Sequence, residues 1–309
     1  MSVRNTIDLS TSIGSVVLKN PVLTASGTSG HGAELAAYID LSSLGAVVVK
    51  SLAAEPWPGN PPPRLKPVHL GMLNSVGLQG PGVAAWLEDD LPSLVDVGAT
   101  IVASIWGRSV EEFALAAKLM SGAPEAVVAV EVNVSCPNLD DDELLFSMSP
   151  SATAAALEAA QPCGRPLWAK LSPAAGDIVA VARSALEAGA EALTLVNTMP
   201  ADELGLLSEG RRLGSGAGGL SGPALRPFAY AAVTQVSAAL PGASIVAAGG
   251  IVSSDDALAY LLAGAGAVEV GTATFFDPRS PAQVLDGLRR SCNKRGFTSL
   301  SELCGSDRG

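Results

Sequence analysis

Cys136 stands in a short polar motif whose residue types could remove a proton from a substrate. The motif, Asn133-Val134-Ser135-Cys136-Pro137-Asn138, places side-chain amides around the thiol and a proline that restricts the following turn. A thiol ordinarily titrates near ~8.5, so a modest electrostatic push makes it a competent base or nucleophile near neutral pH. The alternative is a small apolar core residue, the usual fate of a free cysteine. We assign the other three cysteines to that alternative: Cys163, Cys292 and Cys304.

Two lysines end apolar runs and indicate an anionic ligand. Lys50 ends the run VVVK, and Lys170 ends the run LWAK. Burying an unpaired ammonium is costly, so each side chain must either reach solvent or meet an anion. One such lysine can arise by chance, but two at the same edge of a fold suggest that an anion binds there. A Schiff-base lysine, as in barrel aldolases, is the competing function.

Two glycine turns in the last quarter of the chain could hold a phosphate group. Gly249-Gly250 precedes Ser253-Ser254, and Gly271-Thr272 follows the next apolar run. Turns of this kind let backbone N–H groups approach an anion closely, and each leads toward the start of a helix. Single glycines are also explained by tight turns alone, but the pair favours a phosphate site that needs no basic cluster.

Asn74 and Asn197 add amide groups in two further loops. Asn74 lies in MLNSVGL (72–78), and Asn197 directly precedes Thr198. Paired amides can satisfy a small ligand rich in C=O and N–H groups, such as a pyrimidine ring. Taken singly, each asparagine is typical of a turn. We assign both histidines, His31 and His69, to loops or solvent, since neither belongs to a recurrent catalytic arrangement.

Eight short apolar or β-branched runs predict the strands that would position these side chains. They cover residues 21–27, 46–50, 100–105, 129–135, 166–171, 192–197, 244–250 and 267–273. Helical patterns lie between them, at 110–120, 151–160, 178–188, 224–240 and 255–263. Strands buried on both faces and joined by crossover helices form a parallel sheet, and eight repeats favour a closed (β/α)8 TIM barrel over an open sheet. The polar residues above then follow strand ends, where barrel enzymes place their active sites.

The chain is expected to form a single domain over residues 1–309, because no linker divides it. Two segments interrupt the alternation of strands and helices. The Pro-rich segment 55–67 and the Gly-rich segment 205–222 each follow a predicted strand. We therefore expect both to form loop insertions over the carboxyl-terminal mouth of the barrel.

Composition excludes several classes of protein. Hydrophobic residues make up 48% of the chain and charged residues 16%, so the chain can bury enough apolar area to fold. Nucleic acid is not an expected partner, since 19 Lys and Arg stand against 30 Asp and Glu and no basic run exists. No membrane span or signal peptide is expected, which predicts a cytoplasmic protein. Four scattered cysteines and two histidines predict no metal or iron–sulfur site.

The ordered motifs resemble those of the dihydroorotate dehydrogenases, and specifically the catalytic subunit of the class 1B enzymes. The resemblance extends over nearly the whole chain through LKNPVLTASGT (18–28), GNPPPR (59–64), MLNSVGLQGPG (72–82), NVSCPN (133–138), AKLSP (169–173), GGLSGPAL (218–225), AAGGI (247–251) and VGTA (270–273). It implies an FMN-containing barrel that oxidises (S)-dihydroorotate to orotate in pyrimidine biosynthesis.

By position, the resemblance also assigns site residues. FMN would be held by Ser26, Lys50, Ser51, Asn133, Lys170, Val196, Gly222, Gly249, Gly250, Gly271 and Thr272. The substrate ring would be held by Lys50, Asn74, Ser75, Val76, Gly77, Leu78, Asn133, Asn138, Asn197 and Thr198. Cys136 would be the base, with Lys50 close to both ligands. Forming the ring double bond requires loss of a proton and of a neighbouring hydride, hence a thiolate on one face of the ring and a flavin on the other. Lys170 would stabilise the negative charge of reduced flavin.

The resemblance further implies an electron-transfer partner. Class 1B enzymes pass electrons to NAD⁺ through a separate subunit that carries FAD and an iron–sulfur cluster, in a homodimer or heterotetramer. The scattered cysteines of this chain fit that division of labour. They would equally fit a relative that uses fumarate.

Three features depart from the family pattern and keep alternatives open. Ser104 stands where asparagine is usual, as in the related dihydropyrimidine dehydrogenase barrel, and Gly80 replaces another asparagine. The acidic run 140–143 replaces a glycine-rich catalytic loop, and its charge would slow the approach of an anionic substrate. The alternatives are an FMN enzyme acting on another dihydropyrimidine and a non-catalytic flavin-binding barrel. A dihydrouridine synthase is disfavoured by the net charge of −11.

Overall fold

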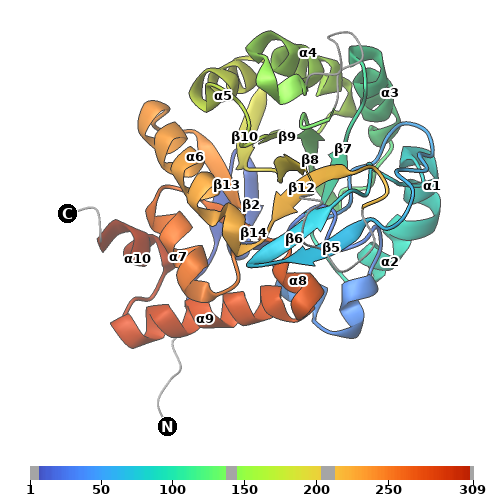
Figure 1. The fold of residues 1–309 in the computed structure, drawn as a ribbon. Coiled ribbons are helices and arrows are strands. Elements are labelled where there is room, and N and C mark those ends of the chain that lie inside the picture. Colours follow the sequence, from blue (N-terminus) through green and yellow to red (C-terminus); the bar gives the residue numbers. More distant parts are fainter. Residues whose placement is uncertain (1–6, 137–144, 203–212, 307–309) are drawn as a thin grey trace.

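Eight parallel strands form the centre of the computed structural model, which describes residues 7–136, 145–202 and 213–306. They are β3 (Val22–Thr24), β4 (Val47–Val48), β7 (Ile101–Ile105), β8 (Val127–Asn133), β9 (Leu167–Leu171), β10 (Ala190–Leu195), β13 (Ser244–Ala248) and β14 (Ala267–Val270). They pair in the order β3-β14-β13-β10-β9-β8-β7-β4, and a parallel bridge between Leu23 and Ala46 joins the two end strands (Figure 1). The predicted (β/α)8 TIM barrel is therefore confirmed.

Helices surround this barrel (Figure 1). The five predicted helices are α3 (Val110–Met120), α4 (Pro150–Ala160), α5 (Ile178–Glu187), α6 (Arg226–Ala239) and α7 (Ser254–Leu262). Most of these helices follow a short polar residue whose side chain accepts a hydrogen bond from a backbone N–H in the first turn. Ser109 caps α3 in this way, and Ser253 caps α7. Apolar faces such as Phe113, Ala117 and Met120 of α3 pack on the outer side of the strands.

Several further helices and helical turns were not predicted from the sequence. They are α1 (Val83–Ala85), the π-helical turn η3 (Trp86–Asp90), α2 (Leu91–Asp96), α8 (Ala273–Phe276), α9 (Ser280–Arg295) and α10 (Leu300–Ser306), with 3-10 turns at η1 (Glu34–Ala37), η2 (Leu41–Ser43), η4 (Phe146–Met148), η5 (Gln161–Cys163) and η6 (Pro223–Leu225). Helix α9 packs against α7 and β3 and completes the outer ring.

The barrel interior is apolar toward the amino ends of its strands and polar toward their carboxyl ends. A hairpin of β1 (Thr11–Ile13) and β2 (Val16–Leu18) packs its buried side chains against interior residues such as Trp168 and Ala267. Successive residues of a strand point to opposite faces, so the next inward residues after these two are Lys170 and Glu269. This alternation places charged side chains directly above the apolar plug.

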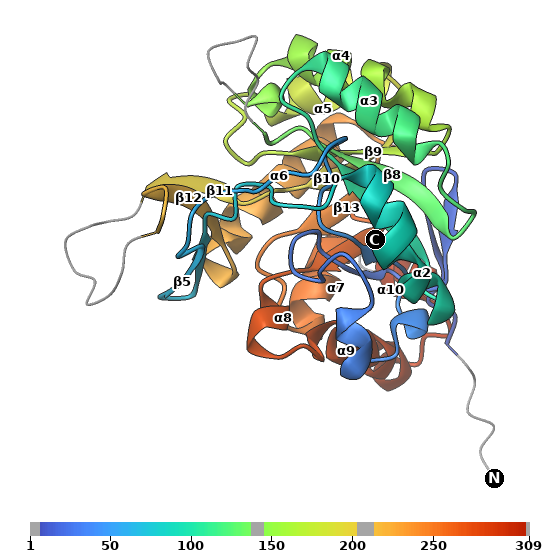
Figure 2. The same cartoon turned by 90° about the vertical axis from the view of Figure 1, so that its right-hand side faces the viewer.

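A second sheet covers the carboxyl ends of the barrel strands, and we call it the mouth sheet. It consists of β5 (Leu65–Val68), β6 (Gly71–Asn74), β11 (Met199–Asp202) and β12 (Ala217–Ser221), antiparallel in the order β11-β12-β6-β5. Figure 2 shows it standing out from one end of the barrel. The insertions were expected at this end, but not their pairing with each other, in which Gly219 lies opposite Asn74.

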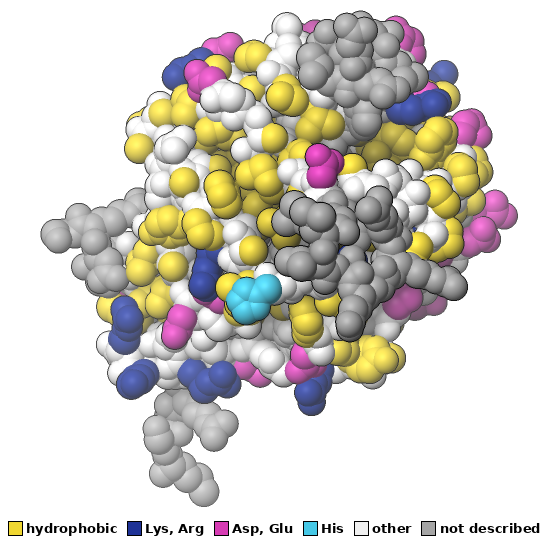
Figure 3. Space-filling view, in the orientation of Figure 1, with side chains coloured by type: hydrophobic (Ala, Val, Ile, Leu, Met, Phe, Trp, Pro, Cys, Tyr) yellow, Lys and Arg dark blue, Asp and Glu magenta, His cyan; other side chains and the backbone are white. Residues whose placement is uncertain are grey.

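The face of the molecule that contains the mouth of the barrel shows no dense cluster of charged side chains among the described residues. Lys and Arg side chains lie singly and mainly toward the edge of this face, with hydrophobic side chains between them (Figure 3).

Among the residues that the structure describes, no helix is both long and apolar enough to cross a membrane. That residues 1–309 form a single domain stays a prediction.

Candidate active site

A cavity lies at the carboxyl ends of the barrel strands, beneath the mouth sheet. Every residue predicted to hold the cofactor belongs to its lining, from Ser26 after β3 to Thr272 after β14. Most of the predicted substrate residues line it too: Asn74, Val76, Gly77, Leu78, Asn133, Asn197 and Thr198, with Lys50 shared between the two sets. The predicted residues are therefore brought together in one place.

Two predicted substrate residues are not found in this lining. The Ser75 hydroxyl is buried behind it, where it accepts a hydrogen bond from Asn60 Nδ2 at 3.0 Å and contacts the Ser215 hydroxyl. The expected contact of the Ser75 side chain with a substrate is therefore not supported by this arrangement. Asn138, like the acidic run 140–143, lies outside the described residues.

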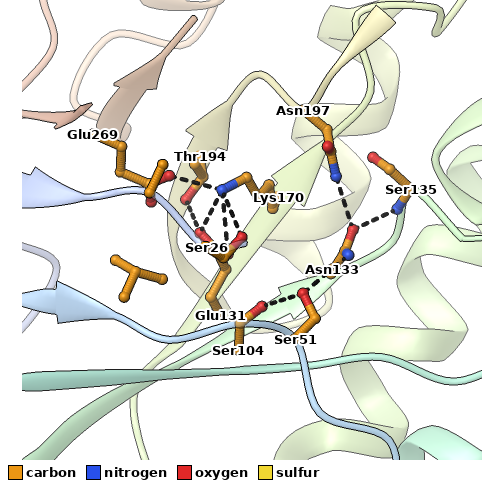
Figure 4. A network of polar contacts seen from close by, with 12 residues as sticks. Ser26, Ser51, Ser104, Glu131, Asn133, Ser135, Lys170, Thr194, Asn197 and Glu269 are labelled. Atoms are coloured by element: carbon orange, nitrogen blue, oxygen red, sulfur yellow. Dashed lines mark hydrogen bonds and ion pairs between the residues drawn. The ribbon is translucent and has the colours of Figure 1, made fainter. Parts of the chain in front are cut away.

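A buried charge cluster forms the floor of the cavity (Figure 4). The Lys170 ammonium contacts Glu269 Oε2 at 2.7 Å and Glu131 Oε1 at 3.4 Å, and it donates a hydrogen bond to the Ser26 hydroxyl at 3.2 Å. Thr194 Oγ1 donates to Glu131 Oε2 at 3.1 Å. These side chains come from different strands, and the closed barrel brings them into contact.

The charges of this cluster shift one another's titration. Burial alone would lower the pKa of Lys170, but the charges of Glu131 and Glu269 raise it above its ordinary value. Burial, and next the charge of Glu131, raise the pKa of Glu269 to about 8, against the lowering effect of Lys170. At neutral pH, Lys170 is therefore a cation, and burial beside Glu131 favours the neutral form of Glu269.

Lys50 is a second cation beside the cavity. Burial, and then the nearby Lys170 ammonium, lower the pKa of Lys50 to about 8. Within the described ranges, no carboxylate lies close enough to Lys50 Nζ to form an ion pair. An ammonium in this position attracts an anion, as its place at a strand end predicted.

The side-chain amides of the site are linked to one another (Figure 4). Asn133 Oδ1 accepts hydrogen bonds from Asn197 Nδ2 at 3.0 Å and from the Ser135 backbone N–H at 3.1 Å, and Asn133 Nδ2 donates to the Ser51 hydroxyl at 3.2 Å. Asn197 Oδ1 in turn accepts from the Thr198 backbone N–H at 2.7 Å. These bonds orient the amide groups before any ligand binds.

The glycine turns after β13 and β14 bring backbone close to the cavity. Gly250 has φ +72°, and a Cβ there would lie 2.5 Å from Arg226 Cβ, so glycine is required at this turn. A Cβ at Gly271 would lie 3.1 Å from Ala25 Cβ, at the wall of the cavity. Within the described part of the chain, the N–H groups of Gly250 and Ile251 have no protein acceptor. Such N–H groups are suited to bind a phosphate.

Cys136 differs from the expectation for an easily ionised thiol. Its side chain is fully buried, and its Sγ donates to the Gly107 carbonyl oxygen at 3.0 Å. Burial raises the pKa of Cys136 to about 12, so the predicted electrostatic push toward the thiolate is wrong for this conformation. Cys136 is absent from the cavity lining, whereas its neighbour Ser135 belongs to it.

Ser135 and the two buried glutamates were missed by the sequence analysis. The Ser135 hydroxyl is buried with no hydrogen-bond partner among the described residues, and Glu269 is part of the cavity lining. Strand periodicity could have found them, because Glu131 and Ser135 lie two residues on either side of Asn133. The same periodicity directs Cys136 to the opposite side of the chain.

The two described departures from the family pattern have local explanations. The Ser104 hydroxyl lies 2.9 Å from the Ser51 hydroxyl and is fully buried, so it orients a cavity residue rather than contacting a ligand. A Cβ at Gly80 would lie 3.2 Å from Nε2 of His31, whose half-buried imidazole occupies that space. Among the described residues, no group of three or more His, Cys, Asp and Glu is placed to hold a metal ion.

Comparison with known proteins identifies the family of this chain. The family model described as dihydroorotate dehydrogenase matches residues 8–291. The catalytic subunit of dihydroorotate dehydrogenase B (NAD(+)) from Desulforudis audaxviator is 44% identical over 295 residues, which cover 95% of each chain. The protein of the same name from Geotalea daltonii is 40% identical over 300 residues, 97% of this chain and 98% of that one. This chain belongs to the dihydroorotate dehydrogenase family.

Proposed function

We propose that the protein oxidises dihydroorotate to orotate in pyrimidine biosynthesis, using FMN bound in the cavity. The observation that carries the proposal is the composition of this cavity. It combines the Lys170 ammonium in its floor, the linked amides of Asn133 and Asn197, and the Lys50 ammonium. A carboxylated pyrimidine ring matches these groups, because the amides satisfy its C=O and N–H groups and a free cation satisfies its carboxylate.

The cavity also fits FMN. The N–H groups of Gly250 and Ile251 would bind the phosphate, and the close approach of backbone at Gly271 leaves room for it. Lys170 would contact the ring system and oppose the negative charge that develops there. When bound, FMN supplies the acceptor for two electrons and a proton, which no side chain of this protein can provide.

The chain's own residues would supply substrate orientation and proton removal. Lys50 would hold the carboxylate of the substrate, while Asn133 and Asn197 would fix the ring. We keep Cys136 as the base, which requires its thiol to turn from the Gly107 carbonyl toward the substrate. Contact with Lys50 or another cation in that position would lower its pKa toward the working range.

We further propose that the electrons pass to NAD⁺ through a separate subunit carrying FAD and an iron–sulfur cluster, in a homodimer or heterotetramer. The relatives' designation as NAD(+) catalytic subunits supports a division of labour. Exposed apolar side chains of Leu70, Val252 and Phe276 line a groove that shares Thr272 with the cavity, which offers a surface for such a partner. Among the described residues, Cys136, Cys163 and Cys292 form no disulfide, which is compatible with the cytoplasm.

The proposed function is tested by an anaerobic visible spectrum of the purified, FMN-reconstituted protein before and after addition of dihydroorotate. Rapid bleaching of the flavin band, with slow or no bleaching by dihydrouracil, is expected because only the first substrate has a carboxylate for Lys50. Equal bleaching by both compounds would indicate another dihydropyrimidine as substrate. A protein that binds FMN without bleaching would be a non-catalytic flavin barrel. Rapid reduction of NAD⁺ by the chain alone would contradict the separate subunit.

A further inference from the structure

Two buried carboxyl groups under the cavity have no part in the proposed reaction. The side chains of Glu131 and Glu269 are 0% exposed, and both contact the same Lys170 ammonium. Glu269 also lines the cavity, and its Oε1 is buried without a hydrogen-bond partner among the described residues. A buried carboxyl oxygen that lacks a donor is stabilised by carrying a proton rather than a charge.

The charges near this pair do not balance unless one carboxyl group is neutral. Lys170 on β9 supplies one positive charge for two carboxyl groups, on β8 and β14. Lys50, just after the end of β4, is the other nearby cation, but it lines the cavity and forms no ion pair with either carboxyl group among the described residues, so Lys170 alone is in contact with the pair. Strands β3, β4, β7 and β13 carry no titratable side chain, and Glu191 on β10 is exposed at the far end of its strand. One ammonium in contact with two buried carboxyl groups therefore favours one proton on the pair at neutral pH.

We propose that Glu131 and Glu269 share one proton, and that this proton keeps the cavity floor electrically neutral so that negative charge can develop on a ring held against Lys170. The inference rests on the proposed function, since it takes that ring to be the flavin. Glu269 is a positioning residue in this account, acting through Lys170. With both carboxyl groups ionised, the floor would carry a net negative charge and would oppose an anionic ring.

The sharing of a proton links the redox equilibrium of the site to pH. A flavin gains two electrons and one proton on reduction and then carries negative charge on its ring. Negative charge near Lys170 raises the proton affinity of the carboxyl pair. Below the pKa of Glu269, which is about 8, the pair holds its proton in both redox states. Above that pH it loses the proton in the oxidised protein and regains one from solvent on reduction.

Redox titration of the FMN-loaded protein across this pH range tests the link. In the wild type, the equilibrium constant for reduction should fall by an extra factor of ten per pH unit above about pH 8, which corresponds to about 30 mV for a two-electron couple. Glu269→Gln and Glu131→Gln should both lose this extra factor, because the remaining carboxylate faces Lys170 alone. Thr194→Val is the matched control: it removes only a hydrogen bond to Glu131 and should keep the extra factor.

Infrared spectroscopy of the wild-type protein without FMN tests the proton itself, independently of any variant. A carbonyl band of a protonated carboxyl group should be present at neutral pH and should fade as the pH passes about 8. Absence of that band at neutral pH, or the same pH dependence of the potential in the wild type and Glu269→Gln, would overturn the inference alone. A protein that binds no FMN would instead overturn the proposed function, and the inference about the ring with it.

Discussion

Replacing Lys170 with methionine tests the charge cluster that underlies the site. Methionine keeps much of the length of the side chain but removes the ammonium that contacts Glu269 at 2.7 Å and Glu131 at 3.4 Å. Because the pair holds one proton, one carboxylate is then left with an uncompensated buried charge. Breaking a buried pair in this way costs about 3 to 5 kcal/mol of the free energy of unfolding. That is a large share of the ~5 to 15 kcal/mol typical of a folded protein.

The loss in free energy of unfolding caused by Lys170→Met should depend on pH, because the variant can neutralise the uncompensated carboxylate by binding a second proton. With no ammonium against the buried pair, the folded variant then binds one proton more than the folded wild type. The contribution of each bound proton is fully present below the unfolded value and is lost as the pH rises toward the folded value. The difference in free energy of unfolding between wild type and variant should therefore grow by about 1.4 kcal/mol per pH unit between about pH 5 and pH 7.

Urea unfolding of both proteins without FMN, followed by circular dichroism, measures this difference directly. The triple variant Lys170→Met, Glu131→Gln, Glu269→Gln replaces the whole cluster with neutral side chains of similar size. It should recover most of the lost stability and show no pH-dependent difference of its own from this region. A loss below about 1 kcal/mol at neutral pH, or an equal loss at both ends of the pH range, would show that Lys170 does not compensate a buried carboxylate charge.

Three further predictions concern the ligands. Gly271→Val places a side chain against Ala25 and should weaken FMN binding at least about tenfold, about 1.4 kcal/mol, in a fluorescence titration. Gly176→Ala, where a Cβ meets nothing within 4 Å, is the control that should change nothing. The KM for dihydroorotate should rise as the pH passes about 8 and Lys50 loses its charge; a flat profile would contradict that role. Cys136→Ala should keep FMN but slow flavin reduction by dihydroorotate about 10²- to 10⁴-fold in stopped flow, and unchanged rates would exclude the thiol as base.

The barrel could be predicted because each of its elements carries a local signal. Runs such as 100–105 are apolar and β-branched enough to predict a strand, and helix α3 was placed at 110–120 by its periodicity. The mouth sheet could not be predicted in the same way. Its strands β6 and β12 lie far apart in the sequence, and its Gly-rich and Pro-rich segments resemble loops. Their pairing depends on the barrel bringing both segments to one edge.

Which residues belong to the candidate site could be predicted from the sequence more fully than their charges and mutual contacts. Lys170 and Asn133 stand at strand ends, so barrel geometry alone brings them to one face. The role of Glu269 depends on its contact with Lys170 across the closed interior, between strands β14 and β9, which are far apart in the sequence. Strand periodicity places Cys136 on the side away from the cavity, but its contact with the Gly107 carbonyl, in the loop after β7, could not be predicted from the sequence.

A crystal structure of the protein with FMN and orotate is the decisive test of the proposed active site. We expect the phosphate to bind the N–H groups of Gly250 and Ile251. We also expect the flavin ring against Lys170 and the orotate carboxylate at Lys50. A flavin bound elsewhere, or an orotate whose carboxylate avoids Lys50, would contradict the assignment of this cavity as the active site.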